Sequence, residues 1–430
     1  MANGIKVGTF SANTSTGNQT VSWTGTSFTP NFVVLWTQGQ TSNGKSTSSG
    51  VSFSWGMTDG TNHYSVNIAY EDGAATSNAS RQYSTTNLLK LSDHTGAIDG
   101  VCNHVSFGSQ QFVIDWPSDA PTGAVQIHYL AMECTSVAVG TYAYSTSVTD
   151  IVVSGLGFQP NTLITLGTSQ TTADSIEANA AFFMGMATGA TAESCCSFWM
   201  EDAAANTNDA RGVVTNATAR GFLSAVPGVD MIADFQSFDV GGFTLNVTDA
   251  AASAHICGYA AIVVDNAISG TATNPTTDIT EDTITGVGFL GTGAIFMGIQ
   301  SSSTTGADSA FFFGAADDES TINNAAAGFY TDDAAAVSSA GTVESNTLCV
   351  SQYYHDGTLR GDGLVASYKN DSGGQVSMTW TNTSGARQFS YIVMAQAASA
   401  GGGRIMGAIA GEGGLAGLGG MSGQHGGLVG

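Results

Sequence analysis

Four short patterns of residues occur three times along this 430-residue chain, about 130 residues apart. Each pattern keeps its spacing from the others to within a few residues. Chance similarity in a chain rich in Ser, Thr and Gly would not hold such a register. The patterns are VGTF at 7–10, VGTY at 139–142 and SGTA at 269–272; FTP at 28–30, FQP at 158–160 and FLG at 289–291; SFSWG at 52–56, AFFMG at 181–185 and AFFFG at 310–314; and an acidic pair at 71–72, 201–202 and 332–333.

The length of the period indicates whole domains, because solenoid units repeat every 20 to 50 residues. We predict three repeats in tandem at 1–136, 137–266 and 267–398, followed by a glycine-rich tail at 399–430. Each repeat is long enough to bury a core of its own. The connections between repeats are short and lack long Gly/Ser runs, so a stiff rod or a compact cluster is expected.

Within each repeat the sequence predicts short β-strands. Segments such as 32–36, 111–116 and 125–130 are rich in β-branched and aromatic residues and are bounded by Gly, Pro, Asn or Ser. Long helical periodicity is absent, and the helix-forming residues Glu, Lys, Arg and Gln are scarce. We therefore expect an all-β chain of three antiparallel β-sandwiches, each made of two sheets packed face to face.

Charge and hydropathy exclude several classes of partner. Lysine and arginine together number 10 against 34 acidic residues, which gives a formal net charge of −24. Such a surface repels phosphate backbones and anionic lipid headgroups, so neither nucleic acid nor membrane insertion is expected. No run of 18 apolar residues is present to span a bilayer, and the first six residues contain no apolar signal core.

The six cysteines form no CxxC pair, and two of them are adjacent in sequence. We interpret them as small buried hydrophobic residues, with disulfides or a metal cluster as the alternatives. They are Cys102, Cys134, Cys195, Cys196, Cys257 and Cys349.

The acidic pairs are the best candidates for a site. Carboxylates near Asn side chains and backbone carbonyls could hold calcium, although no EF-hand loop is present. The alternative is that these carboxylates lie in turns and cap backbone N–H groups. No other cofactor is predicted. The candidate ligands are Glu71, Asp72, Glu201, Asp202, Asp332 and Asp333.

The sequence offers little evidence of catalysis. It contains no GxSxG, HExxH or P-loop motif. Paired acids are compatible with glycoside hydrolysis, but a pattern repeated three times suits a scaffold or a multivalent binder better. The tryptophans could stack on sugars, although most lie in expected strands, where core packing is the favoured interpretation. Five of the six are Trp36, Trp55, Trp116, Trp199 and Trp380.

The tail has a period of three residues, which is the period of a polyproline-II helix. Glycine occupies one phase from 411 to 426, small residues occupy the second, and larger side chains occupy the third. A disordered tail is one interpretation. We favour a segment that orders by docking on another chain or on copies of itself, with a trimer as one plausible form. Its predicted docking residues are Ile409, Gly411, Gly414, Leu415, Gly417, Leu418, Gly420, Met421 and Gly423.

Two segments of the second repeat, GFQPNTL at 157–163 and SFDVGGFTLN at 237–246, resemble tandem β repeat domains of structural proteins from tailed viruses of bacteria or archaea. That family carries a GFxP strand entry and a later DGFTLNW-like strand. The first and third repeats depart from both motifs. The glycine-rich tail is similar to the polyglycine segments of phage adhesins. The resemblance implies a virion protein without enzymatic activity, and it transfers no catalytic residue.

These observations favour a non-enzymatic structural protein of a virion surface, assembled in the host cytoplasm. It would be a tail-fibre or receptor-binding component, or a capsid decoration protein. Its expected partners are other virion proteins, copies of itself and host surface glycans. The alternatives are a multivalent carbohydrate-binding protein and a glycan-cleaving enzyme of the virion.

Overall fold

The computed structural model describes residues 4–43, 48–211, 217–222, 228–299, 306–354 and 356–396. Within these ranges the chain consists of antiparallel strands and one 3₁₀ turn, Asp371–Gly373. The prediction of an all-β chain is confirmed. The predicted docking residues of the tail lie outside the described residues.

Within the described ranges, eleven strands fall in each repeat. The first repeat contains β1 (Ile5–Ser11), β2 (Gly17–Ser22), β3 (Phe32–Thr37), β4 (Ser48–Ser49), β5 (Val51–Thr58), β6 (His63–Tyr70), β7 (Ala79–Ser84), β8 (Leu89–Ser92), β9 (Ile98–Gly108), β10 (Gln111–Trp116) and β11 (Gln126–Met132). The second contains β12 (Ser136–Ala143), β13 (Ile151–Val153), β14 (Thr162–Gly167), β15 (Glu177–Ala178), β16 (Ala180–Gly189), β17 (Ala192–Met200), β18 (Asp209–Arg211), β19 (Ala219–Phe222), β20 (Val229–Asp239), β21 (Gly242–Asp249) and β22 (Ile256–Val263). The third contains β23 (Asn266–Thr273), β24 (Ile279–Thr285), β25 (Gly293–Ile299), β26 (Gly306–Ala307), β27 (Ser309–Asp317), β28 (Asn324–Thr331), β29 (Ala340–Ser345), β30 (Val350–Tyr353), β31 (Leu359–Lys369), β32 (Gln375–Thr381) and β33 (Gln388–Ala395).

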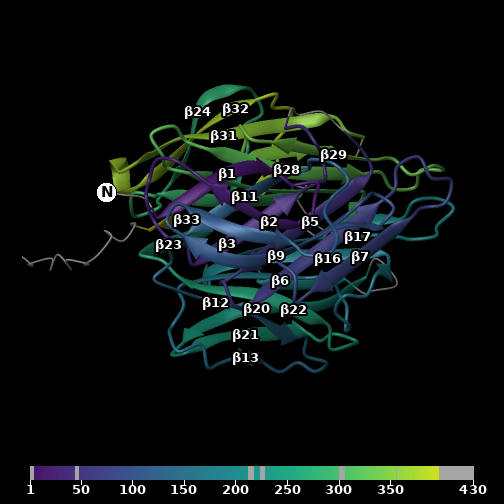
Figure 1. Cartoon of the computed structure of the whole chain (residues 1–430), viewed down its shortest axis with the longest axis horizontal. Coiled ribbons are helices and arrows are strands. Elements are labelled where there is room, and N and C mark those ends of the chain that lie inside the picture. Colours follow the sequence, from purple (N-terminus) through teal and green to yellow (C-terminus); the bar gives the residue numbers. More distant parts are fainter. Residues whose placement is uncertain are drawn as a thin grey trace, which may run out of the picture.

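The strands form the same two sheets in every repeat. The larger sheet of the first repeat has the order β1-β11-β3-β5-β6-β7, and the smaller has the order β2-β10-β9-β8. The second and third repeats reproduce both orders strand for strand. In Figure 1 the smaller sheet of the third repeat (β24, β31, β32) lies at the top of the molecule and that of the second (β13, β20, β21) at the bottom.

Each larger sheet is completed by a strand from another repeat. The two-residue strand β15 of the second repeat pairs with β7 of the first, and β26 of the third pairs with β18 of the second. The ring closes because β4 of the first repeat pairs with β29 of the third. An edge strand that would otherwise offer unpaired N–H and C=O groups is thereby covered in all three sheets.

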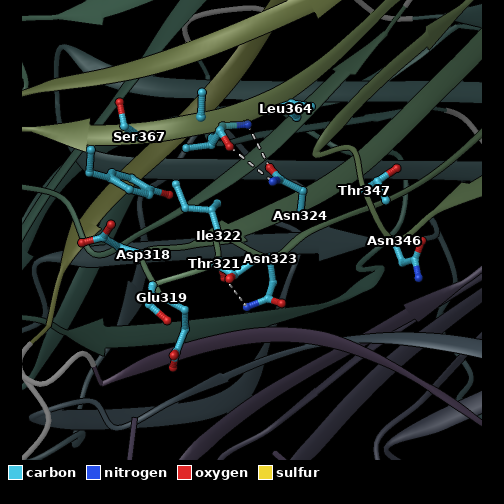
Figure 2. A pocket seen from close by; sticks show the side chains of 14 residues that line it. Asp318, Glu319, Thr321, Ile322, Asn323, Asn324, Asn346, Thr347, Leu364 and Ser367 are labelled. Atoms are coloured by element: carbon cyan, nitrogen blue, oxygen red, sulfur yellow. Dashed lines mark hydrogen bonds between the residues drawn. The ribbon is translucent and has the colours of Figure 1, made fainter. Parts of the chain in front are cut away.

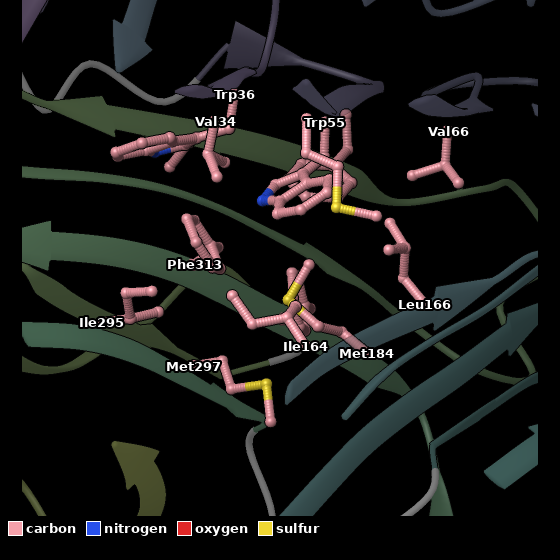
Figure 3. Packing of buried hydrophobic residues seen from close by; sticks show 14 of the residues in the cluster. Val34, Trp36, Trp55, Val66, Ile164, Leu166, Met184, Ile295, Met297 and Phe313 are labelled. Atoms are coloured by element: carbon pink, nitrogen blue, oxygen red, sulfur yellow. The ribbon is translucent and has the colours of Figure 1, made fainter. Parts of the chain in front are cut away.

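The central strands of the three larger sheets are buried on both faces. All six residues of β3 are buried. Val33 and Leu35 point into the sandwich core of the first repeat, whereas Val34 and Trp36 enter a core shared by all three repeats. Burial on both faces explains why these strands read as continuous hydrophobic runs rather than alternating ones. Figure 3 shows side chains from the three repeats, among them Val34, Ile164 and Ile295, packed together in this interior.

Three phenylalanines at matching positions of the third sequence pattern meet in the shared core. The ring centroids of Phe53 and Phe182 are 5.8 Å apart, and Phe311 lies 5.4 Å from each of them. All three contacts are edge-to-face, the geometry that aromatic quadrupoles favour. One residue from each repeat is thus needed to fill a single site. The three repeats therefore form a compact cluster. The predicted domain boundaries, at 1–136, 137–266 and 267–398, stay a prediction.

The glycine that ends the same pattern allows the two sheets of each repeat to approach closely. A Cβ atom added at this position would lie within 2.0 Å of a backbone oxygen on the smaller sheet's side, which no side chain can tolerate. The three pairs are Gly56 and Leu88, Gly185 and Thr218, and Gly314 and Cys349.

Candidate functional site

The second residue of each acidic pair lies at a junction between repeats. Asp202 accepts a hydrogen bond from the backbone N–H of Ala79 in the first repeat, at 3.0 Å. Asp333 accepts one from Asp209 in the second repeat, at 2.8 Å. Asp72 accepts one from Ala340 in the third repeat, at 2.9 Å. The capping interpretation is confirmed for these three carboxylates, with the difference that each caps a neighbouring repeat rather than its own turn.

A hydroxyl residue reinforces each of these junctions. The hydroxyl of Ser77 accepts the N–H of Ala204, and the Ser77 N–H donates to the Ala204 carbonyl. Thr207 and Ser338 make the same pair of bonds to Ala335 and Ala74. The loops that carry the acidic pairs therefore interlock around the ring. Backbone groups in these loops find partners only when all three repeats are present.

The side chain of Glu71, the first residue of its pair, has a more local environment. The carboxylate of Glu71 accepts a hydrogen bond from the Asn78 side chain at 2.8 Å, within its own repeat. Among the described residues, no group of three or more His, Cys, Asp or Glu side chains is placed to hold a metal ion. Calcium at the acidic pairs therefore stays a prediction, and the geometry supports a structural role.

A second ring of hydrogen bonds between repeats was not predicted from the sequence. Asp59 accepts the backbone N–H of Val139 at 2.9 Å, and Asp317 accepts that of Val7 at 2.9 Å. The hydroxyl of Thr188 accepts the N–H of Ser269 at 2.8 Å. Each acceptor follows the glycine of the third pattern by three residues. This constant spacing was the available signal, but the change from Asp to Thr obscured it.

The residue that follows the FxP pattern fastens the C-terminal end of its own repeat. Asn31, the next residue, bonds through its side chain to both backbone groups of Cys134, at the start of the connection to the second repeat. Asn161 clamps Val264 in the same way. In the third repeat Thr292 forms this clamp with Gln396.

A cavity with a volume of about 580 Å³ lies on the third repeat. It is formed by the loop between β27 and β28, the residues after β29, and β31. The loop spans 318–323, whereas the equivalent loops of the first and second repeats span 59–62 and 190–191. The sequence carries this signal as a longer spacing between the third pattern and the acidic pair.

Buried Asp317 anchors the cavity's loop. Its carboxylate accepts the backbone N–H of Asn323 at 2.9 Å and the Asn323 side-chain amide at 2.9 and 3.0 Å. Lys6 of the first repeat lies 3.6 Å from the same carboxylate. At the other end of the loop, Asn324 bonds to both backbone groups of Val365 on β31. The loop is therefore fixed at both ends before any ligand arrives.

The lining of the cavity mixes polar and apolar side chains, and it carries only negative formal charge. Figure 2 shows Asp318 and Glu319 on one side of Ile322 and Asn346 and Thr347 on the other. Glu319 is engaged by Lys6 at 3.7 Å and by the backbone N–H of Thr26 at 3.1 Å. Burial, followed by the neighbouring Asp317 carboxyl, raises the pKa of Asp318 to about 6.

Five of the six tryptophans do not form a sugar-stacking surface. Trp36, Trp55, Trp116 and Trp199 are fully buried, and Trp380 is 1% exposed. The core interpretation is confirmed, and stacking on these rings is ruled out in this fold. All six cysteines are free and buried, as predicted.

Comparison with known proteins adds no relative. No known protein family matches this sequence, and no curated protein or solved structure is significantly similar to it. Among the described residues, no helix has the length and apolarity to cross a bilayer. The fold and its junctions define the class of protein as a single-chain all-β ring of three paired sheets around a shared core.

Proposed function

We propose that the protein is a non-enzymatic structural component of a virus particle's surface, serving as a capsid decoration or as part of a tail fibre. The observation that carries the proposal is the closed exchange of β4, β15 and β26 around one core. These three short strands each cover an edge of a larger sheet. A ring whose sheet edges are covered in this way is suited to bear load on the surface of a particle.

The surface composition supports the same proposal. Charged residues make up only 10% of the chain, and the net charge is −24. A surface of hydroxyl and amide groups stays hydrated over a wide range of salt concentrations, because little of its solvation depends on screened charges. The glycine-rich tail would join this block to the assembly.

The proposal is tested on virus particles purified from the source of the protein. Antibodies raised against the chain should label the particles in immunogold electron microscopy, and the position of the gold distinguishes head from tail. Failure to label any particle, with the protein recovered instead in the particle-free fraction, would contradict the proposal.

The role of the tail needs a separate comparison. A chain ending at Ala398 should be excluded from particles. In solution it should form a smaller oligomer than the full chain does. Equal incorporation of both chains, with both monomeric, would show that the tail does not dock.

A further inference from the structure

We propose that the cavity bounded by 318–323 and β31 binds a neutral saccharide. This inference deepens the proposed function and rests on it for its biological setting, because a surface protein that meets the host would use such a site for attachment. Its volume of about 580 Å³ falls within the range of about 300–1,000 Å³ typical of small-molecule sites.

The charge of the lining selects against anionic ligands. Asp318 and Glu319 are the charged residues among those that line the cavity, and neither Lys nor Arg lines it. A phosphate, sulfate or sialic acid group would meet repulsion without a compensating cation. Glu319 is already held by Lys6 and Thr26, so a cationic ligand would meet only the carboxyl of Asp318.

The polar groups suit hydroxyls. Asn346 offers both amide donors and an acceptor, and Ser367 offers a hydroxyl that can donate and accept. The Thr347 hydroxyl also lines the cavity and shares one hydrogen bond with Ser345, at 3.2 Å. A sugar hydroxyl requires this dual capacity, because it donates one hydrogen bond and accepts others. Half-buried Ile322 and Leu364 add an apolar surface against which the C–H face of a pyranose ring can pack.

The lining is preorganised, which lowers the entropic cost of binding. The loop is held by Asp317 at one end and by the Asn324–Val365 bonds at the other. Ala366 lies at a β-bulge between β31 and β32, an irregularity that alters the direction in which neighbouring side chains project.

The experiment uses the full chain with methyl glycosides of neutral hexoses and N-acetylhexosamines as probes. Saturation-transfer NMR detects binding, and an array of neutral, sialylated and sulfated glycans reports selectivity. Ala366→Trp fills the cavity from an exposed position. The matched control is Gln236→Trp, which places the same side chain at the equivalent exposed bulge of the second repeat.

We expect binding to a neutral saccharide that Ala366→Trp weakens at least tenfold and Gln236→Trp leaves unchanged, with both variants retaining the wild-type urea midpoint. Asp318→Asn, which preserves shape, should change the preferred saccharide without unfolding the chain. No binding to any neutral glycan, binding that survives Ala366→Trp in a folded variant, or selectivity for anionic glycans would each overturn the inference.

One further outcome would also overturn it. Terbium luminescence that appears without saccharide and disappears in Asp318→Asn would assign the cavity to a cation. Release of reducing ends from the bound glycan would leave saccharide binding in place and would contradict the non-enzymatic role proposed above. Failure of the inference is distinguishable from failure of the proposed function, because immunogold labelling of particles does not depend on the cavity.

Discussion

The carboxylate of Asp72 accepts a hydrogen bond from the backbone N–H of Ala340, and this 2.9 Å contact joins the first repeat to the third across 268 positions. Equivalent contacts join the second repeat to the first and the third to the second. Every repeated acidic pair thus contributes one residue to ring closure. The repetition in sequence reflects an interface that is built three times within one molecule.

Replacing Asp72 by Ala should destabilise the whole ring. The change leaves a part-buried N–H of Ala340 without its partner, which costs about 1–3 kcal/mol. Urea unfolding followed by tryptophan fluorescence measures the loss. Glu71→Ala is the matched control, because Glu71 bonds within its own repeat. A larger effect from Glu71→Ala than from Asp72→Ala would contradict the assigned roles.

Truncating Phe311 to Ala should lower the free energy of unfolding by about 3–5 kcal/mol, since it empties a site filled by three repeats. Phe311→Leu should cost less because it retains most of the buried volume. We expect a single cooperative transition at every probe position, since Phe53 and Phe182 lose packing at once. Three separable transitions in calorimetry would show that the repeats unfold independently.

Glu344 gives the protein a pH-dependent stability. It is fully buried on β29 and accepts hydrogen bonds from the Thr37 hydroxyl, at 2.8 Å, and from the Gln38 N–H. Burial raises its pKa to about 8. Between the unfolded value, near 4.5, and about 8, the folded state holds a proton that the unfolded state has lost. Stability therefore falls as pH rises through this window, by up to about 1.4 kcal/mol per pH unit.

Glu344→Gln removes this titration while it keeps an oxygen to accept the bonds from Thr37 and Gln38. Urea midpoints measured at pH 5 and pH 8.5 should differ less in the variant than in the wild type. An equal pH dependence in both proteins would show that Glu344 does not titrate in this window.

The chain should tolerate a new order of its repeats. The N–H of Gly4 donates to the carbonyl of Gln396 at 2.8 Å, so the two ends of the described chain meet. A permutant that joins Gln396 to Gly4 through a short Gly/Ser linker and opens after exposed Thr135 should fold with the same near-ultraviolet circular dichroism as the 4–396 chain. Opening within buried β5, after Trp55, is the control that should fail to fold.

Much of the fold could be predicted from local sequence. β-branched and aromatic runs predicted strands such as β3 and β10, and the constant spacing of four patterns predicted repetition. The FxP pattern lies beside Asn31, whose function the sequence could not reveal because it depends on Cys134, 103 positions away. The cavity was detectable only as extra length in one loop, since its far wall comes from β31.

The sequence alone determined that the chain is all-β and that its patterns repeat three times, because propensity and period are properties of local segments. The tertiary structure decided what covers the second face of each larger sheet. The two-residue strand β4, Ser48–Ser49, has no hydrophobic pattern to predict its pairing with β29. Its position follows from ring closure, where the shared core brings the first and third repeats together.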